Sequence, residues 1–171
     1  MKATGIVRRI DELGRVVIPK EIRRTLRIRE GDALEIYTDR EGGVILKKYS
    51  LVGELCDFAK EYAESIQQSV GHIAAICDKD TIIAISSPHR RDIAIGSPLA
   101  VDKPIHDDVE AVMQMREKLN RSTANGDAMI GITQNDEQGR TYTAQLIIPI
   151  LAAGDAIGAE QINLYHEVPL Q

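Results

Sequence analysis

The chain has 171 residues, of which 43% are hydrophobic and 27% charged, and its formal net charge at pH 7 is -5. This composition is typical of a folded globular protein and excludes a disordered or collagen-like chain, and the length allows one domain or two small ones. No apolar run approaches the roughly 18 residues that a membrane span needs, and residues 1–5 lack the apolar core of a signal peptide, so we expect a cytoplasmic protein with no membrane partner.

The charge is divided unevenly along the chain. Residues 1–50 contain twelve Lys and Arg against eight Asp and Glu, a net charge of +4, whereas residues 51–171 carry -9. In residues 1–29, nine basic residues stand against three acidic ones, and seven of the nine are arginines. A basic segment joined to an acidic one indicates that only the first meets a polyanion.

The first fifty residues predict two hairpins and a short helix. Residues 5–10 and 15–18 are β-rich and flank the turn sequence Asp-Glu-Leu-Gly, which predicts the first hairpin. Pro19 suits the first turn of a helix, expected over residues 19–26. Residues 33–37 and 44–48, joined by a loop that contains two glycines, predict the second hairpin.

The strands of this first unit are apolar on both faces, as in the neighbours Val16 and Val17. Such strands must be covered on both faces. Fifty residues without a disulfide or metal bury too little surface to do so alone. We therefore expect an intertwined β-barrel dimer in which the hairpins of two copies interleave, so that each basic side chain is duplicated across a twofold axis.

An amphipathic helix is predicted next, over residues 51–70, with Ser50 as its N-cap. Its apolar positions recur at spacings of three and four and are Leu51, Leu55, Phe58, Tyr62 and Ile66. This near-heptad stripe is suited either to pairing with the same helix of a second copy or to packing onto the C-terminal half of its own chain.

The rest of the chain predicts an antiparallel sheet with helices, so that the fold class is α+β. The expected strands are residues 72–77, 81–86, 129–133, 141–151 and 155–165, and a second amphipathic helix is expected over 107–119, after a loop at 86–104. Glu160 and Gln161 interrupt the aliphatic pattern of the last strand, which we therefore expect at an edge of the sheet or frayed.

Candidates for catalysis or metal binding are weak. Cys56 and Cys77 lie far apart, without a CxxC or Cys/His spacing, which indicates two buried thiols and no zinc site. The acidic residues 107, 108 and 110 suit a helix start better than acid/base chemistry. The histidines have no ligand spacing and are His72, His89, His106 and His166. We expect no metal, no cofactor and no enzymatic activity.

The arginines are the candidate binding residues. A planar guanidinium suits bidentate contact with a phosphate or a guanine edge. No aromatic residue occurs in the first 36 positions. This argues against base stacking on single strands and favours double-stranded DNA.

Residues 4–49, TGIVRRIDELGRVVIPKEIRRTLRIREGDALEIYTDREGGVILKKY, resemble the swapped-hairpin DNA-binding domain of the AbrB family of bacterial transition-state regulators. The segments ELCDFAKEYAES, GHIAAICDKD and ILAAGDAIGA resemble members of that family whose C-terminal half is a GAF domain. This second resemblance is clear over residues 51–85 and 150–159 and fades between 86 and 140. The division implied is residues 1–50 as DNA-binding domain, 51–70 as linker helix and 71–171 as GAF-like regulatory domain.

The resemblance implies a sporulation-type transcription regulator, an activator, a repressor or both, on the bacterial nucleoid. It implies contacts with A/T-rich duplex DNA through the family positions that correspond here to Arg8, Arg15, Arg23 and Arg24. It further implies a dimer through residues 1–50, a tetramer through the linker helices and GAF-like domains, and an unidentified small ligand. The long final helix of such GAF domains has no counterpart in this sequence.

Two other functions stay open from the sequence. The same N-terminal fold serves antitoxins that neutralise a partner toxin, although their tails are usually disordered and residues 51–171 look folded. A GAF enzyme that reduces methionine sulfoxide is the third reading, and it would need partnered, accessible thiols.

Overall fold

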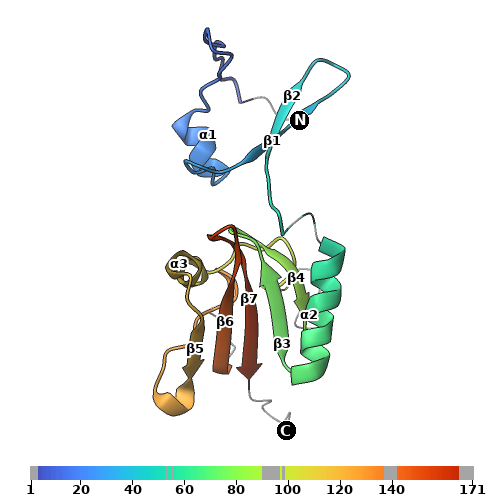
Figure 1. Ribbon diagram of the computed structural model, residues 1–171, viewed down its shortest axis with the longest axis vertical. Coiled ribbons are helices and arrows are strands. Elements are labelled where there is room, and N and C mark those ends of the chain that lie inside the picture. Colours follow the sequence, from blue (N-terminus) through green and yellow to red (C-terminus); the bar gives the residue numbers. More distant parts are fainter. Residues whose placement is uncertain are drawn as a thin grey trace. The chain divides into compact units, whose positions relative to one another are not determined.

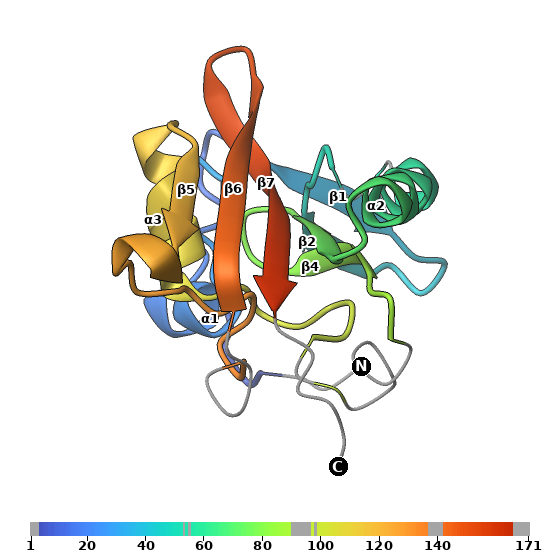
Figure 2. The same cartoon turned by 90° about the horizontal axis from the view of Figure 1, so that it is seen from below.

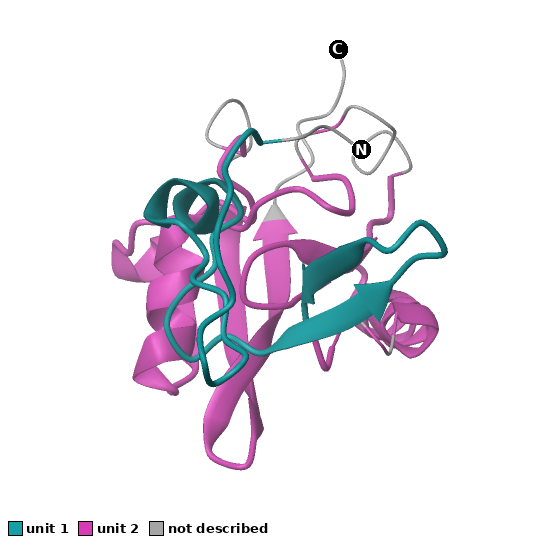
Figure 3. Ribbon diagram, turned by 90° about the horizontal axis from the view of Figure 1, so that it is seen from above, with its two compact units in different colours: residues 1–49 teal, residues 50–171 magenta. Residues whose placement is uncertain are grey.

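The computed structural model describes residues 4–52, 54, 56–89, 97, 99–136 and 142–165. The chain divides into two compact units, residues 1–49 and 50–171 (Figure 3). None of the described helices combines the length and the apolar character needed to cross a membrane. The elements are, in order, α1 Lys20–Thr25, β1 Leu34–Thr38, β2 Val44–Lys48, α2 Cys56–Val70, β3 Ile73–Cys77, β4 Ile82–Ser86, α3 Asp107–Met115, β5 Leu119–Ser122, η3 Thr123–Asn125, β6 Tyr142–Ala152 and β7 Asp155–Tyr165.

In the first unit, the helix and the second hairpin form as predicted. α1 follows Pro19, whose φ of -55° leads into the first helical turn. β1 and β2 pair antiparallel, with Leu34 opposite Lys48 and Thr38 opposite Val44. The loop between them is closed by the Asp39 backbone N–H, which donates to the Gly43 carbonyl at 3.0 Å.

The first predicted hairpin is not formed in the single chain. Residues 4–10 and 15–18 are not in strands, although the Asp11 N–H donates to the Arg15 carbonyl at 3.0 Å across the predicted turn. An isolated two-stranded ribbon is marginal in water, and the described residues of this unit leave its apolar side chains uncovered, Val7 being 86% exposed. Of residues 4–49, Pro19 alone is buried. The prediction of strands is therefore wrong for one chain by itself.

The second unit is the expected α+β domain, built on a five-stranded antiparallel sheet in the order β4-β3-β7-β6-β5 (Figure 1). Neighbouring residues of β3 point to opposite faces. Ile76 packs with Ala59 and Ala63 of α2, whereas Cys77 packs in the cluster that includes Val109 of α3. The two helices therefore cover opposite faces, and Figure 2 shows β6 and β7 between them.

Helix α2 differs from its prediction in extent and in its buried face. It begins at Cys56, so Ser50 is not its N-cap; the Ser50 carbonyl instead accepts from Glu54 N–H in a preceding turn. The buried side chains are alanines, which let the helix approach β3 and β4 closely. Of the predicted stripe, Phe58 is 63% and Tyr62 45% exposed, and their rings stack with centroids 6.0 Å apart, whereas Ile66 is half-buried. Phe58 and Tyr62 are therefore not buried against the sheet of their own chain, and pairing with a second copy stays a prediction.

Two segments of the second unit were assigned wrongly from the sequence. α3 ends before Arg116, which takes a left-handed φ of 58°, and residues 119–122 form the edge strand β5 instead of continuing the helix. Residues 129–133 form no strand. The Gln145 side chain holds them instead, accepting from Ile130 N–H at 3.1 Å and donating to the Ile130 carbonyl at 2.7 Å.

The last strand, β7, is central rather than at an edge, so the edge prediction is wrong. It pairs with β3 on one side and β6 on the other. Gln161 and Asn163, two residues apart on one face of β7, are fully buried in the core. Asn163 Oδ1 accepts from Gln145 Nε2 at 2.6 Å. The predicted absence of a final helix concerns residues 166–171, which lie outside the described part of the chain, as do positions 90–96 of the predicted loop.

Glu160 lies on the opposite face of β7, and burial raises the pKa of its carboxyl above the ordinary 4.5, an effect partly offset by a hydrogen bond from Tyr62. Between the unfolded and folded pKa values the folded chain binds more protons, so stability falls as pH rises through that window. Glu160→Gln is therefore expected to raise the free energy of unfolding at pH 7 by less than about 1 kcal/mol. Denaturant melts at several pH values check this.

In those melts, the gain should shrink to nothing as the pH falls below the ordinary carboxyl pKa, because Glu160 is then protonated in both states. Glu64→Gln, at an exposed position of α2, is the matched control and should change little at any pH. A gain that persists unchanged at acidic pH would contradict this account.

Candidate nucleic-acid interface

The four predicted arginines lie in the first unit, and all four are exposed. Arg8 precedes the turn at residues 11–14 and Arg15 follows it directly, whereas Arg23 and Arg24 belong to the last turn of α1. The side chains of Arg15 and Arg23 make hydrogen bonds within five residues of chain, to Asp11 and to the Ile18 carbonyl. The predicted arginines therefore lie at two separate local structures, the turn at residues 11–14 and helix α1.

Arg15 is the most firmly held of the four. Its Nε donates to Asp11 Oδ2 at 2.8 Å, and its backbone N–H donates to Asp11 Oδ1 at 2.8 Å. These bonds, the backbone one first, lower the pKa of the Asp11 carboxyl, so it stays ionised across the physiological range. The sequence identified Asp11 only as a turn residue. A contact between Asp11 and Arg15 could have been suspected because the aspartate lies four residues before the arginine, with a turn between them.

Arg23 is anchored to the chain that enters its own helix. Its Nε donates to the Ile18 carbonyl at 3.2 Å, and its carbonyl accepts from Ile28 N–H at 2.7 Å. Arg23 and Arg24 are successive residues, which point about 100° apart around a helix axis. Their position in the last turn of α1 is one that the helix dipole favours for cations.

The loop after α1 is fastened by Lys48, whose importance the sequence did not indicate. Its Nζ donates to the Arg27 carbonyl at 3.0 Å and lies 3.3 Å from Asp32 Oδ2. Asp32 Oδ2 also accepts from Arg29 N–H at 2.8 Å. Arg27 itself takes a left-handed φ of 52°, which this clamp helps to hold. The contact spans 21 residues of sequence, so no local pattern could reveal it.

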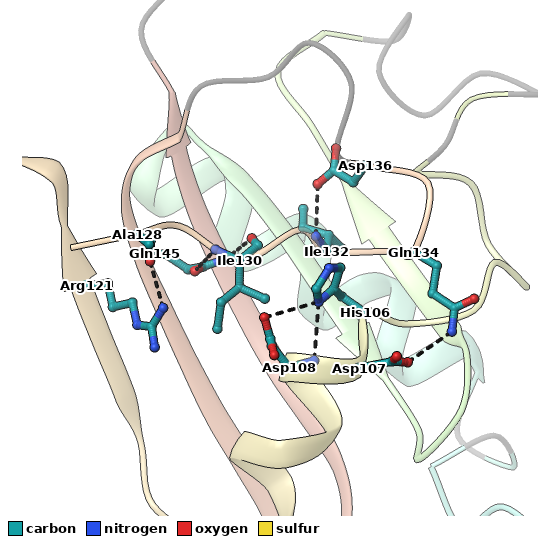
Figure 4. Close-up of polar contacts among 10 residues, drawn as sticks. All are labelled: His106, Asp107, Asp108, Arg121, Ala128, Ile130, Ile132, Gln134, Asp136 and Gln145. Atoms are coloured by element: carbon teal, nitrogen blue, oxygen red, sulfur yellow. Dashed lines mark hydrogen bonds and ion pairs between the residues drawn. The ribbon is translucent and has the colours of Figure 1, made fainter.

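The second unit contains a network of polar contacts (Figure 4) that secures its loops. His106 Nδ1 accepts from Asp108 N–H at 3.2 Å and so caps α3. The buried carboxylate of Asp136 accepts from Ile132 N–H at 2.9 Å and from the Tyr142 hydroxyl at 2.5 Å. These bonds lie within loops and helix ends, which is typical of a structural role. The described residues hold no cluster of three His, Cys, Asp or Glu able to bind a metal ion.

The two cysteines are placed differently. Cys77 is fully buried, and burial raises the pKa of its thiol to about 12, so it stays protonated and unreactive. Cys56 is exposed on α2 rather than buried as the sequence suggested, and neither forms a disulfide. A pair of accessible thiols is therefore not seen among the described residues.

Two known sequence families match the chain, with a boundary close to the one between the two compact units. The sequence model of the family described as stage V sporulation protein T C-terminal, transcription factor, matches residues 54–167. The model of the family described as antidote-toxin recognition MazE, bacterial antitoxin, matches residues 7–53. The two matches follow one another without overlap.

Two relatives come from Bacillus subtilis (strain 168). Stage V sporulation protein T is 53% identical over 160 residues, which cover 93% of this chain and 83% of that protein. The transition state regulatory protein AbrB is 62% identical over 63 residues, which cover 33% of this chain and 65% of AbrB.

Two solved structures are also similar. The N-terminal DNA recognition domain of the Bacillus subtilis transition-state regulator AbrB is 72% identical, with a TM-score of 0.25, and covers 29% of this chain and 92% of that domain. The GAF domain of an Acinetobacter phosphoenolpyruvate-protein phosphotransferase is 11% identical, with a TM-score of 0.49, and covers 73% of each chain.

Proposed function

The chain belongs to the stage V sporulation protein T family of transcription factors, and from this premise we propose that it regulates transcription by binding duplex DNA through Arg8, Arg15, Arg23 and Arg24. The observation that supports this most directly is an exposed arginine set on a basic unit whose sequence is 62% identical to a transition state regulatory protein. Arg15 is paired with Asp11 and Lys48 with Asp32, whereas Arg8, Arg23 and Arg24 make no ion pair to the described residues.

The DNA-binding form is proposed to be a dimer through residues 1–50. Its support is the burial pattern of the first unit, where large apolar side chains are exposed although a folded monomer rarely leaves so many together. Val7, Leu13 and Val17 are each more than 70% exposed. A second copy that interleaves its own strands would cover these side chains and supply the ladder partners that residues 4–10 and 15–18 lack.

Further pairing to a tetramer through α2 and the GAF-like unit is also proposed. The exposed stack of Phe58 and Tyr62 on α2 supports it, because this is the stripe with near-heptad spacing.

A small ligand of the second unit stays a prediction. Gln161 Oε1 and Asn163 Nδ2 are buried and have no hydrogen-bond partner among the described residues, and a polar ligand or a water would satisfy them. We also propose that, as a regulator of transcription, the protein acts on the nucleoid in the cytoplasm.

The salt dependence of binding tests the proposed function. Each arginine that neutralises a phosphate releases counterions, and a dimer presents the four positions twice. If all eight arginines neutralise phosphates, we expect a log–log slope of about -7, so that the affinity for an A/T-rich duplex falls roughly ten-thousandfold between about 50 and 200 mM salt. Fluorescence anisotropy with a labelled duplex measures it. An affinity that barely changes with salt would contradict binding through these arginines.

An antitoxin function is the second candidate, because the antitoxin family model matches residues 7–53. The match of residues 54–167 to a transcription factor family favours the first candidate. The two differ in what they require: a regulator binds duplex DNA as the purified protein, whereas an antitoxin must relieve the growth arrest caused by a toxin. Co-expression with toxins encoded near its gene would therefore separate them.

A further inference from the structure

We infer that Asp11 is a positioning residue for DNA binding, whose carboxylate holds the guanidinium of Arg15 in the orientation that meets the duplex. The inference deepens the proposed function and rests on it. Charge alone suggests the opposite role, because a carboxylate beside a phosphate-binding arginine repels the polyanion. The geometry of the turn is what favours positioning.

One carboxylate holds both the backbone and the side chain of Arg15. Asp11 Oδ1 accepts from Leu13 N–H at 3.0 Å and from Arg15 N–H at 2.8 Å, and Oδ2 accepts from Arg15 Nε at 2.8 Å. The turn is closed again by its backbone, with Gly14 N–H donating to the Asp11 carbonyl at 3.0 Å. Gly14 takes a φ of 76°, which a residue with a side chain rarely adopts. Arg15 therefore leaves a fixed turn in a fixed direction.

The hydrogen bond to Asp11 uses only the Nε–H group of the Arg15 guanidinium and leaves its outer Nη groups exposed. Nε is engaged by Asp11, while both Nη groups make no hydrogen bond to the described residues, and the Arg15 side chain is 70% exposed. The Nη groups carry four of the five guanidinium N–H donors and can contact a phosphate or a guanine edge. A long side chain normally loses rotamer freedom on binding, and Asp11 restricts that freedom before DNA arrives.

The positioning role and charge repulsion predict opposite changes in DNA affinity for the same substitution. Asp11→Asn removes one negative charge, which should strengthen binding to a polyanion if repulsion dominates. The amide keeps one oxygen for the turn N–H groups but offers an NH₂ group, not an acceptor, toward Arg15 Nε. If positioning dominates, Asp11→Asn should weaken binding about three- to tenfold, as expected when a charge-assisted hydrogen bond is lost.

The neighbouring residue supplies a matched control. Glu12 lies in the same turn, is exposed and makes no hydrogen bond to the described residues. Glu12→Gln removes the same charge at nearly the same place, so it reports repulsion alone. It should leave the affinity unchanged or slightly increased.

The experiment is a double-mutant cycle in the full chain. Wild type, Asp11→Asn, Arg15→Ala and the double variant are titrated against a fluorescein-labelled A/T-rich duplex at several salt concentrations, with Glu12→Gln alongside. We expect Asp11→Asn to weaken binding in wild type but not in the Arg15→Ala background, because its effect passes through Arg15. The salt slope should fall in Arg15→Ala, which loses a cation, and stay near the wild-type value in Asp11→Asn.

Each outcome of the cycle decides one question. Tighter binding by Asp11→Asn, or equal weakening in both backgrounds, would overturn the positioning role while leaving the arginine surface standing. Full affinity in Arg15→Ala would instead remove Arg15 from the proposed function itself. Thermal melts verify folding, and Asp11→Ser, whose hydroxyl still accepts a turn N–H, replaces the asparagine variant if that fails to fold.

Discussion

Replacement of Arg15, Arg23 and Arg24 together by alanine is expected to weaken binding of an A/T-rich duplex by more than about a hundredfold. Each arginine contact with a base edge or phosphate is worth about 1–3 kcal/mol, and a dimer loses each contact twice. The substituted side chains are exposed, so the first unit should keep its fold. Anisotropy titration measures the affinity, and sedimentation measures whether the dimer persists.

A control must separate the arginine surface from net charge. The exposed residues Arg40, Lys60 and Lys79 lie outside the proposed surface, and replacing all three by alanine removes the same charge. This variant should bind within a few-fold of wild type, because exposed charges that make no contact with the duplex are largely screened at physiological salt. Equal loss in both variants would indicate that binding follows overall charge. Retained affinity in the arginine variant would show that the surface is assigned to the wrong residues.

Replacement of Gly158 by alanine is expected to lower the free energy of unfolding of the second unit by about 3 kcal/mol. Gly158 lies in the central strand β7, and an added Cβ would overlap the carbonyl oxygen of Cys77 in β3. That oxygen is backbone and cannot rotate away, so the two strands would have to separate. Guanidinium denaturation followed by circular dichroism measures the loss.

Irregular strand pairing near Gly158 accounts for the close approach of its backbone to the Cys77 carbonyl. The β3–β4 register shifts between Ile76 and Cys77, and the β6–β7 register shifts next to Ile150, which pairs with Gly158. Irregularities on both sides of this strand bring backbones together at a point where only a glycine fits.

Gly131→Ala is the graded comparison. Its Cβ would lie 3.1 Å from the Thr133 carbonyl oxygen and 3.2 Å from His106 Cδ2, so a small shift relieves the contact, and a loss of under about 1.5 kcal/mol is expected. DNA binding at low temperature should survive both glycine variants, because residues 1–49 form a separate compact unit. A Gly158→Ala variant as stable as wild type would contradict the close approach of β7 to β3.

The arginines of the candidate site stay a prediction from the sequence, whereas the contacts that hold them became visible only in the structure. Arginine clustering and the absence of aromatic residues before position 37 indicated a basic unit suited to duplex DNA, and the family resemblance alone narrowed the set to Arg8, Arg15, Arg23 and Arg24. Asp11 and Lys48 could not be singled out in the same way. Asp11 reads as an ordinary turn residue until its second oxygen is placed on Arg15 Nε, and Lys48 reaches Arg27 across 21 residues of chain.

The amino-acid sequence by itself determined the order of most elements, because hydrophobic periodicity and turn chemistry act over a few residues. α1, the β1–β2 hairpin, β3, β4 and the long β6–β7 hairpin follow from such local patterns. The division into a basic and an acidic half also followed directly from composition.

Only the tertiary structure decided which faces are buried and where each strand lies in the sheet. Glu160 and Gln161 suggested an edge, yet β7 is central and pairs on both sides. Gln161 Nε2 donates to Cys77 Sγ of the neighbouring strand, and the Glu160 carboxyl accepts a hydrogen bond from Tyr62 of α2. The stripe with Phe58 and Tyr62 suited either a second copy or the sheet of its own chain, and the structure shows that alanines make the contact with the sheet. Burial and strand order depend on partners distant in sequence, and local patterns carry no information about such partners.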